Sequence, residues 1–389
     1  MRRKQIIFWQ TLPSPHQSAY LRALARMLKE TRIVAVFDRD LDSTRRTLGW
    51  AAPDLSGVET IISPHSRAIE AIARQEPQGT VHLFSELRLG LVQYAYSASR
   101  KTSALIGLLS EARDVRGFAG HLRVAHSYFL ERRFRDRIDF VLGIGYLGVN
   151  WYRSCGYPSE RVFPWAYIVE QTNAVSEHAD NCNDQSRPVS LCFVGQLIDR
   201  KGVDLLINAL AMLDIPATLS VVGDGPLRLS LERLCNRLRL ASRVTFFGSL
   251  PNSEARKLMD SADLLVLPSR YDGWGAVINE ALMSGIPAIC SDNCGAADLV
   301  RSSVQLGAVF RAGSAIDLAR VLGTWIRRGP LSERTRKIIR NWADCITGEA
   351  AARYLVEILG HIDDRTVRPV APWLKAELHS LDGGTAALA

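Results

Sequence analysis

The residues best suited to chemistry lie in one stretch, where an apolar strand at residues 264–267 leads through a turn into a helix. The turn contains Asp272 among several glycines, and the helix carries Glu280 eight positions later. A glycine-rich turn between a strand and a helix commonly presents backbone N–H groups to an anion. The spacing puts Glu280 more than one turn inside the helix. The stretch therefore predicts an anion-binding loop with two carboxylates, and an ordinary strand–turn–helix with two exposed acids is the alternative.

The elements that must position this loop alternate between strands and helices along the chain. Most segments between the strands carry apolar residues at helical spacing, as residues 18–29 do. Such alternation predicts parallel, doubly wound sheets, and 389 residues are enough for two domains. Short apolar runs predict strands at residues 6–9, 33–37, 58–62, 80–84, 104–109, 139–145, 190–195, 217–222, 244–247, 264–267, 286–291 and 307–310.

The composition is that of a globular protein, with 47% hydrophobic and 23% charged residues. No apolar run approaches the length of a membrane span, and the apolar run after the basic start of the chain is too short for a signal peptide. The seven cysteines are scattered and include no C-x-x-C pair. Neither a zinc site nor a disulfide framework is therefore expected, and a reducing cytosol is the default compartment.

The excess positive charge lies entirely in the first half of the chain. Residues 1–170 contain 24 Lys and Arg against 16 Asp and Glu, which accounts for the whole net charge of +8. This asymmetry predicts an anionic partner for that half, with an anionic membrane face, a pyrophosphate-linked acceptor and nucleic acid as the candidates. The sequence contains no recognised nucleic-acid-binding module, so no nucleic acid is expected.

A basic helix predicted at residues 116–137 is the candidate membrane contact. Arginines interleaved with large apolar side chains can dock on anionic lipid. A solvated helix face is the alternative, and His121 and His126 on this helix are interpreted as surface residues. The residues that suggest docking are Arg123, Arg132, Arg133, Arg135, Arg137, Phe129, Leu130 and Phe134.

The second half of the chain resembles the retaining glycosyltransferases of family four, which have the GT-B fold. Asp272 stands where that family usually has Glu. Gln196 stands where the family has Arg, which leaves Arg200 as the substitute charge. A strand ending at Gly248 resembles the one whose end contacts the nucleobase. The matching residues of the two main motifs are Lys201, Gly202, Asp272, Gly273, Gly275, Glu280, Ala281 and Gly285.

The resemblance implies two Rossmann-like parallel-sheet domains facing a cleft, and transfer of a sugar from a nucleotide donor with retained anomeric configuration. The donor would be a UDP- or GDP-sugar, with no further cofactor and no metal, because a lysine and helix N-terminal amides would neutralise the leaving diphosphate. Lys201, helped by Arg200, would stabilise that diphosphate. Glu280 would bind the ribose hydroxyls, and Asp272 would orient the sugar. The implied donor-binding residues are Gly195, Gln196, Arg200, Lys201, Gly248, Asp272, Gly273, Trp274, Gly275, Ala276, Val277 and Glu280.

Fewer residues are implied on the acceptor side. The family has an important residue after the strand that corresponds to residues 104–109, where Glu111 could orient or deprotonate an acceptor hydroxyl. A helix-capping acid is the alternative. His16 stands near the place of the family's paired glycines and is a candidate on the phosphate or acceptor side, with a surface loop histidine as the alternative. The implied catalytic residues are therefore Lys201, Asp272 and Glu111.

The expected organisation has four parts. An acceptor-binding domain occupies residues 1–169, a polar linker 170–188, a nucleotide-sugar-binding domain 189–362, and a segment returning to the first domain 363–389. The expected function is addition of a sugar to a lipid-linked polysaccharide or lipopolysaccharide precursor, in the cytoplasm or at the inner face of the plasma membrane. The alternatives are the same fold acting on a soluble small acceptor and a catalytically silent nucleotide-sugar-binding subunit.

Overall fold

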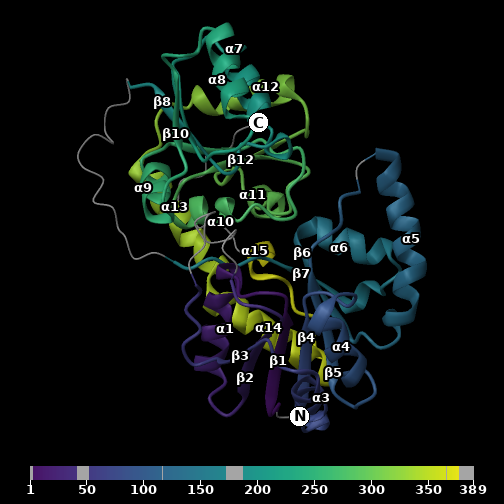
Figure 1. The fold of residues 1–389 in the computed structure, drawn as a ribbon. Helices are drawn as coiled ribbons and strands as arrows, with labels where there is room; N and C mark the ends of the chain where they lie inside the picture. The colour runs from purple at the N-terminus through teal and green to yellow at the C-terminus, as the bar shows by residue number, and fades with distance from the viewer. Residues whose placement is uncertain (1–2, 42–51, 116, 172–186, 365, 376–389) are drawn as a thin grey trace.

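The chain forms two parallel β-sheets, each packed between helices (Figure 1). The computed structural model describes residues 3–41, 52–115, 117–171, 187–364 and 366–375. The expectation of an α/β protein with two parallel sheets is confirmed. In the described part of the chain, no helix combines the length and hydrophobicity needed to cross a bilayer.

The first sheet has the strand order β3-β2-β1-β4-β5-β6-β7. Strands β1, β4 and β6 are buried along their whole length, which is why they appear in the sequence as mainly apolar runs. The strands are β1 (Gln5–Gln10), β2 (Arg32–Phe37), β3 (Glu59–Ile62), β4 (Thr80–Phe84), β5 (Leu105–Ser110), β6 (Phe140–Ile144) and β7 (Val162–Trp165). The helices of this half are α1 (Pro15–Met27), α3 (Ser66–Arg74), α4 (Gly90–Ser99), α5 (Gly117–Arg135) and α6 (Gly145–Ser154).

Strand β7 is one difference from the expectation, because residues 162–165 are not among the predicted strands. β7 pairs in parallel with β6 at the edge of the sheet. It contains Pro164, which lowers the strand propensity of the segment. An edge strand tolerates proline because one of its sides has no neighbour to receive an N–H.

The second sheet has the order β10-β9-β8-β11-β12-β13. Its strands are also parallel, so their carboxyl ends lie at one edge of the sheet. The strands are β8 (Val189–Val194), β9 (Ala217–Val222), β10 (Val244–Gly248), β11 (Leu264–Leu267), β12 (Ala288–Ser291) and β13 (Gly307–Phe310). The helices are α7 (Val203–Ala211), α8 (Arg228–Arg237), α9 (Asn252–Asp260), α10 (Val277–Met283), α11 (Ala297–Arg301), α12 (Ala315–Ile326) and α13 (Glu333–Ala343).

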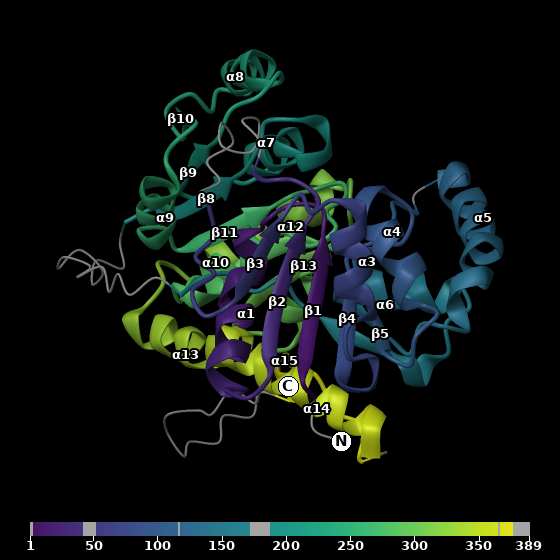
Figure 2. The same cartoon turned by 60° about the horizontal axis from the view of Figure 1, so that its bottom comes forward.

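The chain returns to the first half earlier than the predicted position, residue 363. Helix α14 (Gly348–Asp364) already lies along α1, and the short α15 (Pro372–Lys375) follows it (Figures 1 and 2). Gly348 allows the close approach, since a Cβ there would lie 2.6 Å from the carbonyl oxygen of Ala19. The ring of Tyr354 stacks on Trp165 of β7, with centroids 5.9 Å apart. Residues 348–364 therefore cover the first sheet.

Parts of the predicted boundaries fall outside the described residues, namely most of the linker (172–186) and the tail (376–389). The six cysteines that the structure describes are all free. Within the same residues, no three His, Cys, Asp or Glu side chains gather as ligands for a metal ion.

Candidate active site

The candidate site lies at the carboxyl edge of the second sheet, where open parallel sheets bind their ligands. Several backbones approach one another closely there. The N–H of Gly223 donates to the carbonyl of Gly248 at 2.8 Å, and a Cβ on Gly223 would collide with the carbonyl oxygen of Gly195. Gly202 has φ +66°, and a Cβ there would collide with the carbonyl oxygen of Pro268. Glycine is therefore required for the loops after β8, β9 and β11 to converge.

Lys201 and Asp272, predicted to act on the same donor, form an ion pair. The Lys201 Nζ lies 2.6 Å from the Asp272 Oδ2, and the two side chains are 15% and 11% exposed. Arg200 reaches the other carboxylate oxygen at 3.6 Å and donates to the carbonyl of Tyr271 at 3.1 Å. Two cations thus flank the Asp272 carboxylate at the loop. Such a site can bind a dianionic diphosphate.

Glu280 lies behind this loop on α10. Its carboxylate pairs with Arg256 of α9, with Oε1 3.3 Å from the Arg256 Nη2. Burial raises the pKa of Glu280, while the charge and hydrogen bond of Arg256 act in the opposite direction. The sequence pattern identifies Glu280 but gives no signal for Arg256, which lies 24 positions earlier on another helix.

Trp274 fixes the Asp272 loop to the protein interior, because its side chain is buried and the residue is only 2% exposed. The indole N–H donates to the Oδ1 of Asn279 at 2.8 Å. The Nδ2 of Asn279 in turn donates to the carbonyl of Tyr167, in the first half of the chain, at 3.0 Å. Asn279 and Tyr167 are absent from the predicted site, and only the position of Asn279 beside Glu280 could have suggested one of them.

The remaining predicted donor residues lie in the same region. Gly275 has φ +91°, and its missing Cβ leaves room for the Sγ of Cys294, which would lie 2.8 Å away. Ala276 and Val277 stand at the start of α10 and are half-buried. Gln196, after β8, is exposed. The donor roles of these residues stay predictions.

Glu111 from the first sheet touches the Asp272 loop. A Cβ on Gly273 would collide with the Oε2 of Glu111, so the carboxylate rests against that backbone. Burial raises the pKa of Glu111, and the negative charge of Asp272 raises it further. The hydrogen bond from Tyr167 and the positive charge of Arg200 act in the opposite direction. Glu111 does not cap a helix, because the next helix, α5, begins only at Gly117. The structure thus brings Glu111, the predicted acceptor-side residue, into contact with the Asp272 loop.

His16 lies in a helix and not in a loop. It is the second residue of α1, whose start is fixed by Pro15 and by Ser14, the side chain of which accepts from the His16 N–H. Its ring stacks on Tyr167, with centroids 5.4 Å apart and planes 22° apart. His16 is therefore linked through Tyr167 to Glu111, while its contact with phosphate stays a prediction.

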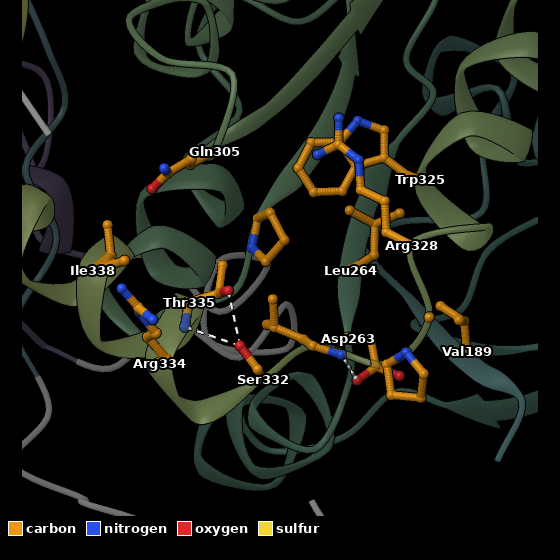
Figure 3. A pocket seen from close by; sticks show the side chains of 14 residues that line it. Val189, Asp263, Leu264, Gln305, Trp325, Arg328, Ser332, Arg334, Thr335 and Ile338 are labelled. Carbon is orange, nitrogen blue, oxygen red and sulfur yellow. Dashed lines mark hydrogen bonds between the residues drawn. The ribbon is translucent and has the colours of Figure 1, made fainter. Parts of the chain in front are cut away.

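A cavity of about 500 Å³ lies elsewhere, beside α12 and α13 (Figure 3). It borders Val189 and Leu264, the first residues of β8 and β11, and thus lies at the amino edge of the sheet. Asp263 within it accepts from Arg187 at 2.7 Å and from the backbone N–H of Leu331 at 2.9 Å. This cavity is distinct from the candidate site and contains none of its residues.

Residues 177–342 match the family model described as glycosyl transferases group 1. The lipopolysaccharide glucosyltransferase WaaG of Escherichia coli is 32% identical over 190 residues, which cover 48% of each chain. Matches to the curated relatives span about a quarter to a half of those relatives' length.

Solved structures share the fold over nearly the whole chain. The lipopolysaccharide outer core galactosyltransferase WaaB, in its apo form, has a TM-score of 0.69 and 14% identity, covering 91% of this chain and 99% of that one. HepE of Anabaena, in complex with UDP, has a TM-score of 0.67 and 17% identity, covering 92% and 99%. At these identities the likeness shows the fold.

Proposed function

We propose that the chain transfers a sugar from a nucleotide-sugar donor to a glycan acceptor, because it shares the fold of WaaB and HepE and its residues 177–342 match the glycosyl transferases group 1 model. The observation that carries the proposal is the meeting of two elements at one place. Asp272, the partner of Lys201, belongs to the loop that Glu111 of the first sheet touches. A donor held by the first element would face an acceptor held by the second.

In the proposed reaction, the bond between the anomeric carbon and the diphosphate breaks, and the acceptor oxygen forms the new bond with retained configuration. Lys201 and Arg200 stabilise the charge that develops on the leaving diphosphate. Asp272 is held by these two cations and orients the donor sugar. Glu111 orients the acceptor hydroxyl and receives its proton, for which a raised pKa suits a group working near neutral pH.

The donor in this proposal is a UDP- or GDP-sugar. The solved HepE structure in complex with UDP favours UDP. The proposal needs no metal, because the two cations at the loop supply the positive charge. Two aspartates that read as a D-x-D sequence, Asp38 and Asp40, are engaged elsewhere: they accept from the backbone N–H groups of Leu91 at 3.2 Å and Leu41 at 2.7 Å.

For the acceptor we propose a lipid-linked polysaccharide or lipopolysaccharide precursor at the inner face of the plasma membrane. The described part of α5 supports this, since it turns Glu131 inward to pair with Arg88 and leaves Phe129 73% exposed. Arg132 and Arg133 are exposed beside Phe129. Exposed apolar and basic residues on one helix are typical of docking on anionic lipid. The names of WaaB and WaaG, both lipopolysaccharide enzymes, point to the same acceptor class.

The proposed function is tested by nucleotide release. Purified protein is incubated with UDP- and GDP-sugars, with and without a bacterial glycolipid extract, and free UDP or GDP is measured. Release that depends on the extract supports the proposal. Donor binding without turnover over a broad acceptor panel would indicate a silent nucleotide-sugar-binding subunit, and release stimulated only by soluble sugars would indicate a soluble acceptor. Failure to bind either nucleotide would overturn the proposal.

A further inference from the structure

Arg256 occupies a distinctive position between two elements of the candidate site. It lies on α9, which directly follows β10, and β10 ends at Gly248, the residue expected near the nucleobase. From there it reaches Glu280 on α10. The side chains of Arg256 and Glu280 are 12% and 16% exposed, whereas the neighbouring residues Glu254 and Lys257 of α9 are exposed to solvent. The pair is therefore shielded from water.

A shielded ion pair of this kind is not explained by stability alone. Removing two charges from water costs several kcal/mol, and apolar residues of similar size are often at least as stable. Across the part of the chain that the structure describes, Arg256 is the one side chain that bonds the Glu280 carboxylate, and it does so at Oε1. The second oxygen, Oε2, makes no hydrogen bond to these residues. Its acceptor capacity is left for a ligand.

The chemistry of a diol fits this arrangement. An ionised carboxylate only accepts hydrogen bonds, so it matches the two hydroxyl donors of a ribose, whereas a protonated one would lose part of that capacity. A carboxylate that is free to rotate would lose conformational entropy on binding, and a partner that already holds one oxygen removes that loss. Arg256 provides both a compensating charge and a fixed geometry.

We propose that Arg256 is a positioning residue that holds Glu280 with one carboxylate oxygen facing the ribose of the donor nucleotide. The inference rests on the proposed function, since it takes the ligand to be a nucleoside diphosphate. Arg256 acts through Glu280 and makes no bond to the ribose. Its effect should therefore appear as discrimination between ribose and deoxyribose.

The test uses the full chain and titration calorimetry with UDP, GDP and their 2′- and 3′-deoxy analogues. Wild-type protein should bind at least one deoxy analogue more weakly than the parent nucleotide. In Arg256→Gln we expect roughly tenfold weaker binding of the parent, corresponding to the loss of about one charge-assisted hydrogen bond. Discrimination against the deoxy analogue should largely disappear. Glu280→Gln should show the same loss of discrimination. The double variant should bind the parent nucleotide no more weakly than the single variant of lower affinity.

The pH dependence provides a readout that a purely structural role would not change. Without Arg256, the pKa of Glu280 should rise further, so nucleotide affinity in Arg256→Gln should fall as the pH is lowered from 8 to 6. The wild type should change less over this range. The matched control is Lys257→Gln, on the next residue of the same helix, which should leave affinity and discrimination unchanged.

Each outcome decides the inference. Arg256→Gln that binds the parent nucleotide and discriminates as the wild type does would overturn it, while the proposed function would stand. Wild-type protein that binds neither nucleotide would overturn both. If Arg256→Gln does not fold, Arg256→Lys is measured, because it keeps the charge and loses the planar geometry; reduced discrimination then supports the inference and unchanged discrimination contradicts it.

Discussion

The carboxyl edges of the two sheets are built differently. The edge of the second sheet has glycines at close backbone contacts, a largely buried Lys201–Asp272 pair and a shielded Glu280. The edge of the first sheet contributes single side chains, Glu111 and His16, which are joined through Tyr167. A site formed by closely approaching backbone strongly constrains its own sequence. A site formed by a few side chains can become specific for another ligand through a few substitutions. The difference fits a common donor in one half and a variable acceptor in the other.

The largest effect on turnover is expected from Lys201→Ala, which removes a positive charge from the carboxyl edge of the second sheet. kcat should fall by about 10²–10³-fold, the usual cost of losing one transition-state donor, with a smaller change in KM. Arg200→Ala is the comparison, because that side chain is 42% exposed and lies 3.6 Å from Asp272; its effect should be under about tenfold. Steady-state kinetics check both. A change in KM alone for Lys201→Ala would contradict the leaving-group role.

Glu111→Gln probes the acceptor edge and should lower kcat by roughly 10²-fold if the carboxylate accepts the acceptor proton. Nucleotide affinity should not change. Because burial raises the pKa of Glu111, the folded protein gains stability from the protonated acid, and this gain is lost as the pH rises through the raised pKa. Gln does not titrate, so the variant does not lose this stability. The melting temperature of the variant minus that of the wild type should therefore increase as the pH is raised from acid to neutral. Calorimetric scans at several pH values test the sign.

Gly273→Ala tests one of the places where the two edges touch. The new Cβ would meet the Oε2 of Glu111, the end of a flexible side chain, so the fold should survive and the carboxylate should move. We expect about a tenfold rise in the acceptor KM, an effect of about 1.4 kcal/mol. UDP affinity should change less. Equal losses of nucleotide and acceptor binding would show that the loop, and not Glu111, is disturbed.

The smallest effect on turnover is expected from Arg132→Glu with Arg133→Glu on α5. Binding to anionic liposomes should fall, because each basic residue near such a surface contributes about 1 kcal/mol. Turnover with a soluble acceptor should be unchanged. Arg67→Glu with Lys101→Glu, at exposed positions elsewhere in the first half, changes the net charge equally and is the control. Equal liposome binding by both variants would indicate that the exposed face of α5 is solvated and does not dock on lipid.

Most strands of the fold could be predicted from the sequence because they are buried on both faces. β4 and β9 match the predicted ranges exactly in extent, since their apolar runs end at turn-forming residues. β7 could not be predicted, because Pro164 is compatible with a strand only at a sheet edge, and the edge is a property of the whole sheet. The early return at Gly348 depends on helix packing that local patterns do not encode.

The candidate site divides in the same way. The motif positions of Lys201 and Asp272 follow from the sequence, and their separation of 71 residues is bridged by the parallel sheet. The pairing of Glu280 with Arg256 could not be predicted, because it depends on how α9 and α10 pack. The contact of Asn279 with Tyr167 joins residues 112 positions apart in different halves, and no residue pattern near either one signals it.

The position of α14 has a consequence for how the protein is made. Its buried residues, from Ala350 to Leu359, pack against elements formed by the first 170 residues, including α1 and β7. During synthesis the early part of the chain emerges from the ribosome long before these residues are translated, and its apolar surface stays uncovered until then. The half that is translated first is thus the half that matures last, and a chain cut short before residue 348 would leave that surface exposed to chaperones and to aggregation.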